Sequence, residues 1–148
     1  MQTDRQGQKN IPGRHIPHGQ APEDRRKSLG DIMSKKILIV DDEPNMRYAL
    51  VRSFELMGCE TYQAINARTA LDAYRRLHPD IVLTDFQLGR DNGVLLAREI
   101  GTYEKSAGLK SRIFLMSGDD VRWKNVRIDG FYCKPISQEG IREMSGNL

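Results

Sequence analysis

Hydrophobic residues along the chain gather in short continuous runs that are separated by longer amphipathic stretches. Three runs are apolar throughout: Ile37–Val40, Ile81–Leu83 and Ile113–Met116. Continuous apolar runs of this length are typical of strands that are buried on both faces. Two weaker runs, near residues 59–64 and 131–133, bring the number of expected strands to five.

The stretches between these runs have helical spacing. Pro44 suits the first turn of a helix whose apolar residues recur every three or four positions until Gly58. Asn66 can cap a second helix that Pro79 closes, and a third helix begins near Gly93. Because strands alternate with helices, the pattern predicts right-handed crossovers and a parallel sheet with helices on both faces.

Residues 1–34 differ from the rest of the chain. They are rich in Gln, Gly, Pro and Arg, and all ten aromatic residues lie between Tyr48 and Tyr132. A segment that cannot bury apolar surface does not offset the entropy lost on ordering. We therefore expect a disordered tail over 1–34 and one folded domain over 35–148.

Composition and charge exclude several classes of protein. Lys and Arg number 23 against 20 Asp and Glu, and part of the net charge of +3 lies in the tail, so the folded part is nearly neutral and is not expected to bind nucleic acid. No apolar run approaches the roughly 20 residues of a membrane span, and no signal peptide is visible, which predicts a cytoplasmic protein without membrane contact. Cys59 and Cys133 lack the partners of a zinc site and are expected to be buried and reduced.

Polar residues follow four of the five runs. These are Asp41-Asp42, Thr84-Asp85, Ser117-Gly118 and Lys134-Pro135. The carboxyl ends of parallel strands meet at one edge of a sheet, where ligands bind. Three carboxylates in a small space repel one another unless a cation joins them, and oxygen ligands at a half-open site suit Mg²⁺ with a phosphate co-ligand. This edge therefore indicates a magnesium and phosphoryl site.

Each residue also has a plainer interpretation. Helix capping explains Asp41 or Asp42 alone equally well, and it explains Ser117 alone better than a reactive role does. Lys134 alone reads as an ordinary loop lysine. The position of all of them at strand ends of one sheet favours a common site, because capping would not require that arrangement.

Four segments, in this order, resemble the receiver domain of bacterial response regulators, the two-component signalling family that includes the chemotaxis regulator. They are ILIVDDE at 37–43, IVLTD at 81–85 with Gly93 eight residues on, FLMSG at 114–118 and FYCKP at 131–135. The resemblance implies an α/β fold: a doubly wound, flavodoxin-like parallel sheet of five strands in the order 2-1-3-4-5, with helices on both faces.

The resemblance also assigns the chemistry. Asp85 would be the phosphoacceptor, receiving a phosphoryl group from a histidine kinase, a histidine phosphotransfer protein or a small phosphodonor as an acyl phosphate. Mg²⁺ would be held by Asp42, Asp85 and the backbone carbonyl of Gln87, with Asp41 acting through water.

The remaining family positions are occupied as well. The resemblance implies that Lys134 pairs with a phosphoryl oxygen, that Ser117 is the switch hydroxyl and that Phe131 is the switch aromatic. The Lys134-Pro135 peptide bond would be cis. Gln87 and Asp119, each two residues beyond a site residue, would tune the attack of water on the acyl phosphate.

Three departures from the family pattern are visible. Gly89 stands where the family usually has proline. The stretch between the phosphoacceptor and the switch hydroxyl is long, and we expect the excess to form a polar loop over Glu104–Ser111. Residues 118–130 are too few for the usual fourth helix, which is expected to be short or irregular, and Ile136–Leu148 predicts a short final helix.

The leading hypothesis is a stand-alone receiver that signals to an unnamed downstream protein and is no enzyme beyond its own phosphotransfer and dephosphorylation. One alternative is a receiver-like binding module whose output is independent of phosphorylation, against which the intact site residues argue. Another is an aspartate-nucleophile phosphohydrolase of the haloacid-dehalogenase type. That type needs a second aspartate two residues after the nucleophile, where this chain has Gln87.

Overall fold

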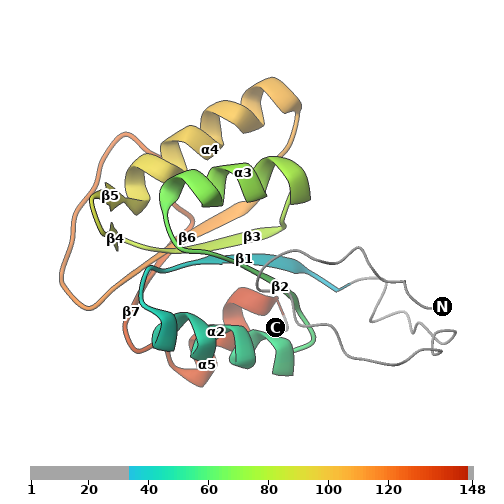
Figure 1. Cartoon of the computed structure of the whole chain (residues 1–148), viewed down its shortest axis with the longest axis vertical. Helices are drawn as coiled ribbons and strands as arrows, with labels where there is room; N and C mark the ends of the chain where they lie inside the picture. Colours follow the sequence, from blue (N-terminus) through green and yellow to red (C-terminus); the bar gives the residue numbers. More distant parts are fainter. Residues whose placement is uncertain (1–33, 147–148) are drawn as a thin grey trace, which may run out of the picture.

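A computed structural model describes residues 34–146 of the chain, in which strands and helices alternate (Figure 1). The main elements are β1 (Lys36–Val40), α2 (Pro44–Leu56), β2 (Glu60–Ala64), α3 (Ala67–Leu77), β3 (Ile81–Asp85), α4 (Gly93–Ala107), β6 (Arg112–Ser117), β7 (Gly130–Cys133) and α5 (Gln138–Ser145). Two short antiparallel strands, β4 (Gln87–Leu88) and β5 (Asp91–Asn92), lie between β3 and α4. The tail predicted over 1–34 lies outside the described residues, apart from Ser34.

Five strands form one parallel sheet in the order β2-β1-β3-β6-β7. This is the predicted order 2-1-3-4-5 in chain sequence, so the doubly wound fold is confirmed. Helices α3 and α4 cover one face of the sheet, and α2 and α5 cover the other (Figure 1). None of the helices described between residues 34 and 146 is long and apolar enough to cross a membrane.

The core has two halves because successive side chains of each strand point to opposite faces of the sheet. Leu38 and Val40 pack with Val82 under α3 and α4. Ile37 and Ile39, from the same strand, pack on the α2 and α5 side. The side chains on both faces of β1 are fully buried from Ile37 to Val40, which explains why this strand is a continuous apolar run rather than an alternating one.

Two of the three predicted helices begin and end where the sequence indicated, and the third, α4, begins at Gly93 as expected. Pro44 is the first residue of α2, where its missing N–H is not needed. The Asn66 side chain accepts a hydrogen bond from the N–H of Thr69 and caps α3, which ends at His78 in a left-handed conformation. The short final helix is α5, which Ser137 caps.

The expectation of a short or irregular fourth helix is confirmed, because residues 118–129 are irregular throughout and form neither helix nor strand. Two other expectations need correction. The polar loop expected over Glu104–Ser111 is wrong in its first half, since α4 continues to Ala107 and the side chain of Glu104 is buried. Cys133 is exposed rather than buried, and Cys59 is partly buried; both are free thiols.

Glu104 is buried because its carboxylate meets four hydrogen-bond donors. Its Oε2 accepts bonds from the Tyr74 hydroxyl (2.6 Å) and from the N–H and hydroxyl of Ser111 (2.7 and 2.8 Å). Its Oε1 accepts a bond from Arg127 Nη2 at 3.0 Å. Burial, and then the bond to Glu104, raises the pKa of Tyr74, so the phenol stays protonated and remains a donor.

The same network fastens the irregular segment to the sheet. Arg127 also pairs with Asp129, whose carboxylate accepts a bond from the N–H of Ile113 in β6 at 2.7 Å. Val126 and Ile128 pack against the core cluster under α3 and α4. The residues just before β7 therefore keep a fixed position without forming a helix.

We expect Glu104→Ala to destabilise the protein by about 3 kcal/mol, because the change leaves buried donors without an acceptor. The measurement is the free energy of unfolding from urea titration. Glu99→Ala is the matched control, since Glu99 is an exposed glutamate of the same helix. Equal stability of the two variants would show that the network contributes nothing.

Candidate functional site

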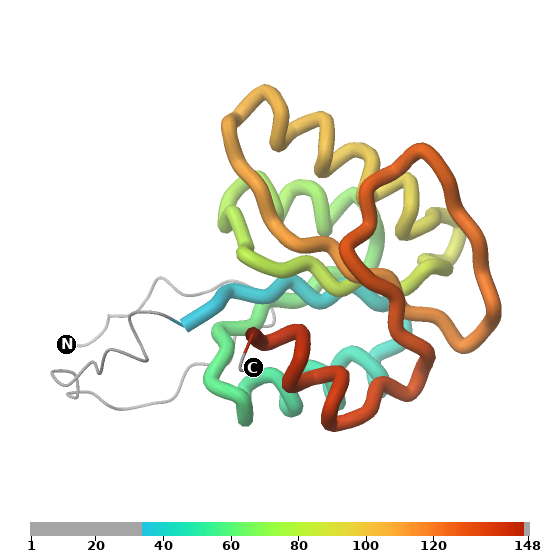
Figure 2. Tube along the Cα trace, turned by 180° about the vertical axis from the view of Figure 1, so that it is seen from behind, coloured from blue at the N-terminus to red at the C-terminus, as the bar shows by residue number. Residues whose placement is uncertain are grey.

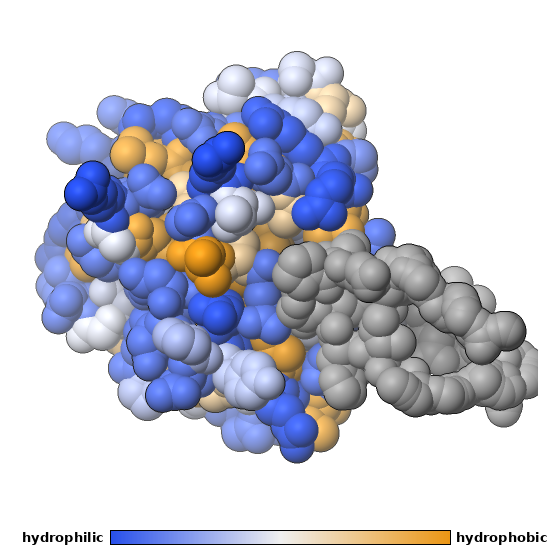
Figure 3. Space-filling view, viewed as in Figure 1, coloured by the Kyte–Doolittle hydropathy of each residue, from blue (hydrophilic) through white to orange (hydrophobic). Residues whose placement is uncertain are grey.

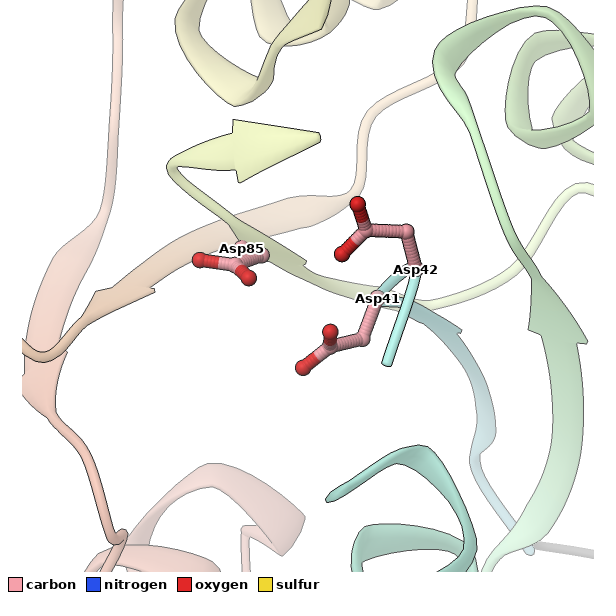
Figure 4. Close-up of side chains that lie close together, drawn as sticks. All are labelled: Asp41, Asp42 and Asp85. Atoms are coloured by element: carbon pink, nitrogen blue, oxygen red, sulfur yellow. The ribbon is translucent and has the colours of Figure 1, made fainter. Parts of the chain in front are cut away.

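Three aspartates meet at the carboxyl edge of the sheet, where β1 and β3 end side by side (Figure 4). Val40 of β1 lies beside Thr84 of β3 in the parallel register, so the residues that follow them are neighbours. Asp41, Asp42 and Asp85 each place one carboxylate oxygen within 4.8 Å of the others. The convergence predicted from the strand ends is confirmed for these three side chains.

Neither Asp41 nor Asp42 caps helix α2. That position belongs to Glu43, whose Oε1 accepts a hydrogen bond from the N–H of Met46 at 3.0 Å. Asp41 instead accepts a bond from the N–H of Glu43 through Oδ1 at 2.9 Å. The capping interpretation of the two aspartates is therefore wrong, and their remaining oxygens face the edge of the sheet.

Lys134, which follows β7, brings a cation to this edge. Its Nζ lies 2.9 Å from Asp85 Oδ2 and 3.2 Å from Asp41 Oδ2. Burial alone lowers the pKa of Lys134, but the hydrogen bond to Asp85 and the charges of both carboxylates outweigh it, so the net shift is upward. The ammonium is thus held in its charged form. The Lys134-Pro135 peptide bond is cis, as expected.

Asp41 is the most deeply enclosed of the three acids, with no exposed surface. Its Oδ2 has no well-aligned hydrogen bond, so the nearby Lys134 ammonium acts on it mainly as a charge. Burial raises the pKa of Asp41, and the Glu43 N–H and Lys134 offset only part of this rise. A buried carboxylate oxygen without a donor is a position that a divalent cation, directly or through bound water, would satisfy.

The charges of the site also fit a divalent cation. Three carboxylates face one ammonium within the described residues, so negative charge remains uncompensated. All the ligand atoms on offer are oxygens, which Mg²⁺ prefers, and Asp42 is exposed, so the site is open to solvent on one side. The residues present therefore fit Mg²⁺.

Two glycines shape the loop between β3 and α4. A Cβ added at Gly93 would lie 2.3 Å from the main-chain oxygen of Asp85, so only glycine fits this close approach. Gly89 has a φ of +61°. Proline is locked near −65° and cannot adopt that conformation, which explains physically why this loop does not carry the proline usual at that position.

Ser117 lies at the same edge, at the end of β6. Its hydroxyl accepts a hydrogen bond from the N–H of Asp119 at 3.0 Å, and its carbonyl accepts one from the N–H of Lys134 at 2.9 Å. Phe131 sits further back, in β7, half-buried, with its ring 6.0 Å from that of Trp123. Of the predicted switch pair, the structure thus brings Ser117 to the acidic cluster but not Phe131.

The two residues expected to tune hydrolysis are both exposed at this edge. Gln87 donates its N–H to Asp85 Oδ1 at 3.3 Å, so its main chain already contacts the central carboxylate. Asp119 is linked to the site by the hydrogen bond that its N–H donates to the Ser117 hydroxyl. Their side chains are open to solvent, where an attacking water would come from.

Sequence reasoning missed the contribution of Arg47. From α2, its Nη1 donates to the carbonyl of Asp41 (2.9 Å) and its Nε to the side chain of Gln63 (2.7 Å). It therefore fixes the main chain of the buried aspartate. Its sequence position gave no signal, because an arginine on a helix is ordinarily solvated.

Comparison with known proteins agrees with this geometry. Residues 37–145 match the family model described as "Response regulator receiver domain". The chain is 44% identical over 69 residues to the regulatory protein AtoC of Escherichia coli, covering 47% of this chain and 15% of that protein. It is 33% identical over 110 residues to the polar-differentiation response regulator DivK of Brucella ovis, covering 71% of this chain and 88% of that protein.

A solved structure shows the same fold. The receiver domain of the sensor histidine kinase PA1611 from Pseudomonas aeruginosa superposes with a TM-score of 0.66 at 17% identity, over 76% of this chain and 98% of that one. In that structure a magnesium ion is coordinated in the active-site cleft.

We expect Gly93→Ala to destabilise the protein by about 2 kcal/mol, because the added methyl group must displace the main chain of Asp85. Gly101→Ala is the matched control in the same helix. A Cβ there meets nothing within 4 Å, so alanine should stabilise by roughly 0.5 kcal/mol through helix propensity. Urea unfolding measures both, and equal effects of the two changes would contradict the close approach.

Proposed function

Since the chain belongs to the family of response regulator receiver domains of two-component signalling, we propose that it accepts a phosphoryl group on Asp85 and signals to a protein partner. The observation that carries this proposal is the meeting of Asp41, Asp42, Asp85 and Lys134 at one sheet edge. A carboxylate oxygen of Asp85 attacks phosphorus, and the bond from phosphorus to a donor histidine nitrogen or to a small acyl donor breaks. The donor keeps the bonding electron pair and Asp85 becomes an acyl phosphate.

Mg²⁺ is the cofactor that the site fits. Asp42, Asp85 and the backbone carbonyl of Gln87 would hold it, with Asp41 acting through water. When bound, the ion neutralises charge on the transferring group. The buried Oδ2 of Asp41 and the uncompensated charge of the cluster support this assignment, as does the magnesium in the similar PA1611 domain.

Lys134 is placed to stabilise the phosphoryl group after transfer. Its ammonium already contacts Asp85 Oδ2, so it lies next to the carboxylate that would carry the phosphoryl group. Its raised pKa keeps it charged at neutral pH. The strand end and the packing fix the ammonium before the reaction, so little reorganisation is needed as charge develops.

The switch is a local change at the end of β6. The Ser117 hydroxyl gives up its role as acceptor for Asp119 N–H and donates a hydrogen bond to the phosphoryl group. Phe131 then turns inward and its contact with Trp123 is lost. The result is a shift between two surface arrangements that a downstream protein distinguishes.

The phosphoryl donor is a histidine kinase or a histidine phosphotransfer protein, as the family implies. Over its matched length the chain spans only part of several relatives, 15% of AtoC among them, so activities of those whole proteins are not carried over. A binding module that works without phosphorylation is the second candidate. The fixed position of residues 126–129, held by Glu104 and Arg127, is the observation that favours it.

Incubation with acetyl phosphate and Mg²⁺ should add the mass of one phosphoryl group to the wild-type protein, measured by intact-protein mass spectrometry. Asp85→Asn should abolish the addition, because the amide is not a nucleophile. Asp91→Asn is the control, since Asp91 is an exposed aspartate of the same loop. Emission of Trp123, the single tryptophan, should change on phosphorylation. An unmodified wild type, or a modified Asp85→Asn variant, would overturn the proposal.

We expect the double variant Gln87→Ala, Asp119→Ala to form the acyl phosphate but to hydrolyse it at a different rate. Both side chains are exposed beside the central carboxylate, where they restrict or orient water. The decay of the phosphorylated species after removal of the donor measures this rate. Identical decay in wild type and double variant would exclude a tuning role for the two residues.

A further inference from the structure

A groove of about 430 Å³ separates helix α4 from the irregular segment before β7. Figure 2 shows this segment passing beside α4 on the side away from the viewer of Figure 1. The apolar residues that line the groove are Ala97, Gly101, Leu109 and Val126. It uses no residue of the acidic cluster and lies outside the site described above.

The groove exists because residues 118–129 form no helix. Val126 and Ile128 reach the core cluster that contains Ala97 and Ile100, so the segment is anchored by two side chains rather than by a helical face. The surface of α4 that faces this segment lines the groove. The volume of the groove lies in the range of pockets that hold ligands.

The lining of the groove carries a net positive charge. Arg98, Lys105, Lys110 and Arg127 line it, and Glu104 is its only carboxylate. The charge of Glu104 is balanced by Arg127, with which it pairs at 3.0 Å, so the net positive charge of the lining comes from the other three cations. Within residues 34–146, no carboxylate lies within 4.0 Å of the other three cations.

We propose that this groove binds an acidic peptide segment of a protein partner, with acidic side chains against the cationic lining residues and an apolar side chain against the apolar ones. Nucleic acid fits less well, because no aromatic residue lines the groove to stack on a base. On the face drawn in Figure 3, hydrophobic residues form patches among hydrophilic ones. The proposal does not depend on phosphorylation of Asp85.

The test uses the unphosphorylated full chain and a fluorescein-labelled peptide of alternating glutamate and leucine, about ten residues long. Binding is followed by fluorescence anisotropy at low salt, because screening weakens exposed charge pairs. We expect the double variant Lys105→Glu, Lys110→Glu to bind at least about tenfold more weakly. The matched control Arg52→Glu, Arg76→Glu makes the same change of net charge on α2 and α3 and should bind within about twofold of wild type.

Two further probes separate the chemistry. A peptide with glutamine in place of glutamate should bind the wild-type protein at least about tenfold more weakly than the acidic peptide does. A single-stranded DNA of equal charge should bind the wild-type protein no more tightly than it binds the Lys105→Glu, Lys110→Glu variant. Unfolding curves of both double variants confirm that each is folded. The proposal is overturned if the acidic peptide does not bind at about 1 mM, if both double variants lose affinity equally, or if the DNA binds as tightly with the same dependence on Lys105 and Lys110.

Discussion

The contact between the ammonium of Lys134 and the carboxylates of Asp41 and Asp85 is the interaction on which the site depends. It joins residues from the ends of three strands, and Asp41 contributes to it from a position with no exposed surface. Taking such charges out of water is costly unless they are paired. The parallel sheet supplies the geometry, because its strands all deliver their last residues to one edge. The chemistry is therefore built into the order β2-β1-β3-β6-β7.

The backbone around the site is as constrained as its charges. Gly93 lets the start of α4 approach the main chain of Asp85, and Gly89 turns the loop with a positive φ. Arg47 of α2 holds the carbonyl of Asp41 by a hydrogen bond. Gly93 and Arg47 act on the main chain of an aspartate rather than on its carboxylate. The buried Oδ2 of Asp41 is left without a hydrogen bond while its position is fixed, as the proposed binding of a cation would require.

The fold and the acidic cluster could be predicted because both follow from short-range patterns. Continuous apolar runs identify buried strands, and residues directly after them must lie at the sheet edge. The choice of Glu43 as the cap of α2 could not be predicted, since Asp41, Asp42 and Glu43 are all suitable acceptors by residue type. The burial of Glu104 was missed for another reason. Its partners Tyr74 and Arg127 are 30 and 23 residues away in the chain, so a polar stretch looked solvated.

The segment between β6 and β7 limits how a change at Ser117 can spread. Residues 126–129 are held by core contacts of Val126 and Ile128 and by the Glu104–Arg127–Asp129 network. A helix could transmit movement by turning as a rigid body, but residues 118–129 form no helix. Under the proposed switch, movement that starts at Ser117 would therefore be confined to the residues between Gly118 and the anchored residues 126–129, which include Trp123 beside Phe131. The absence of a helix within residues 118–129 would thus limit the proposed switch surface to one stretch next to the site, and the basic groove lies beside the anchored residues.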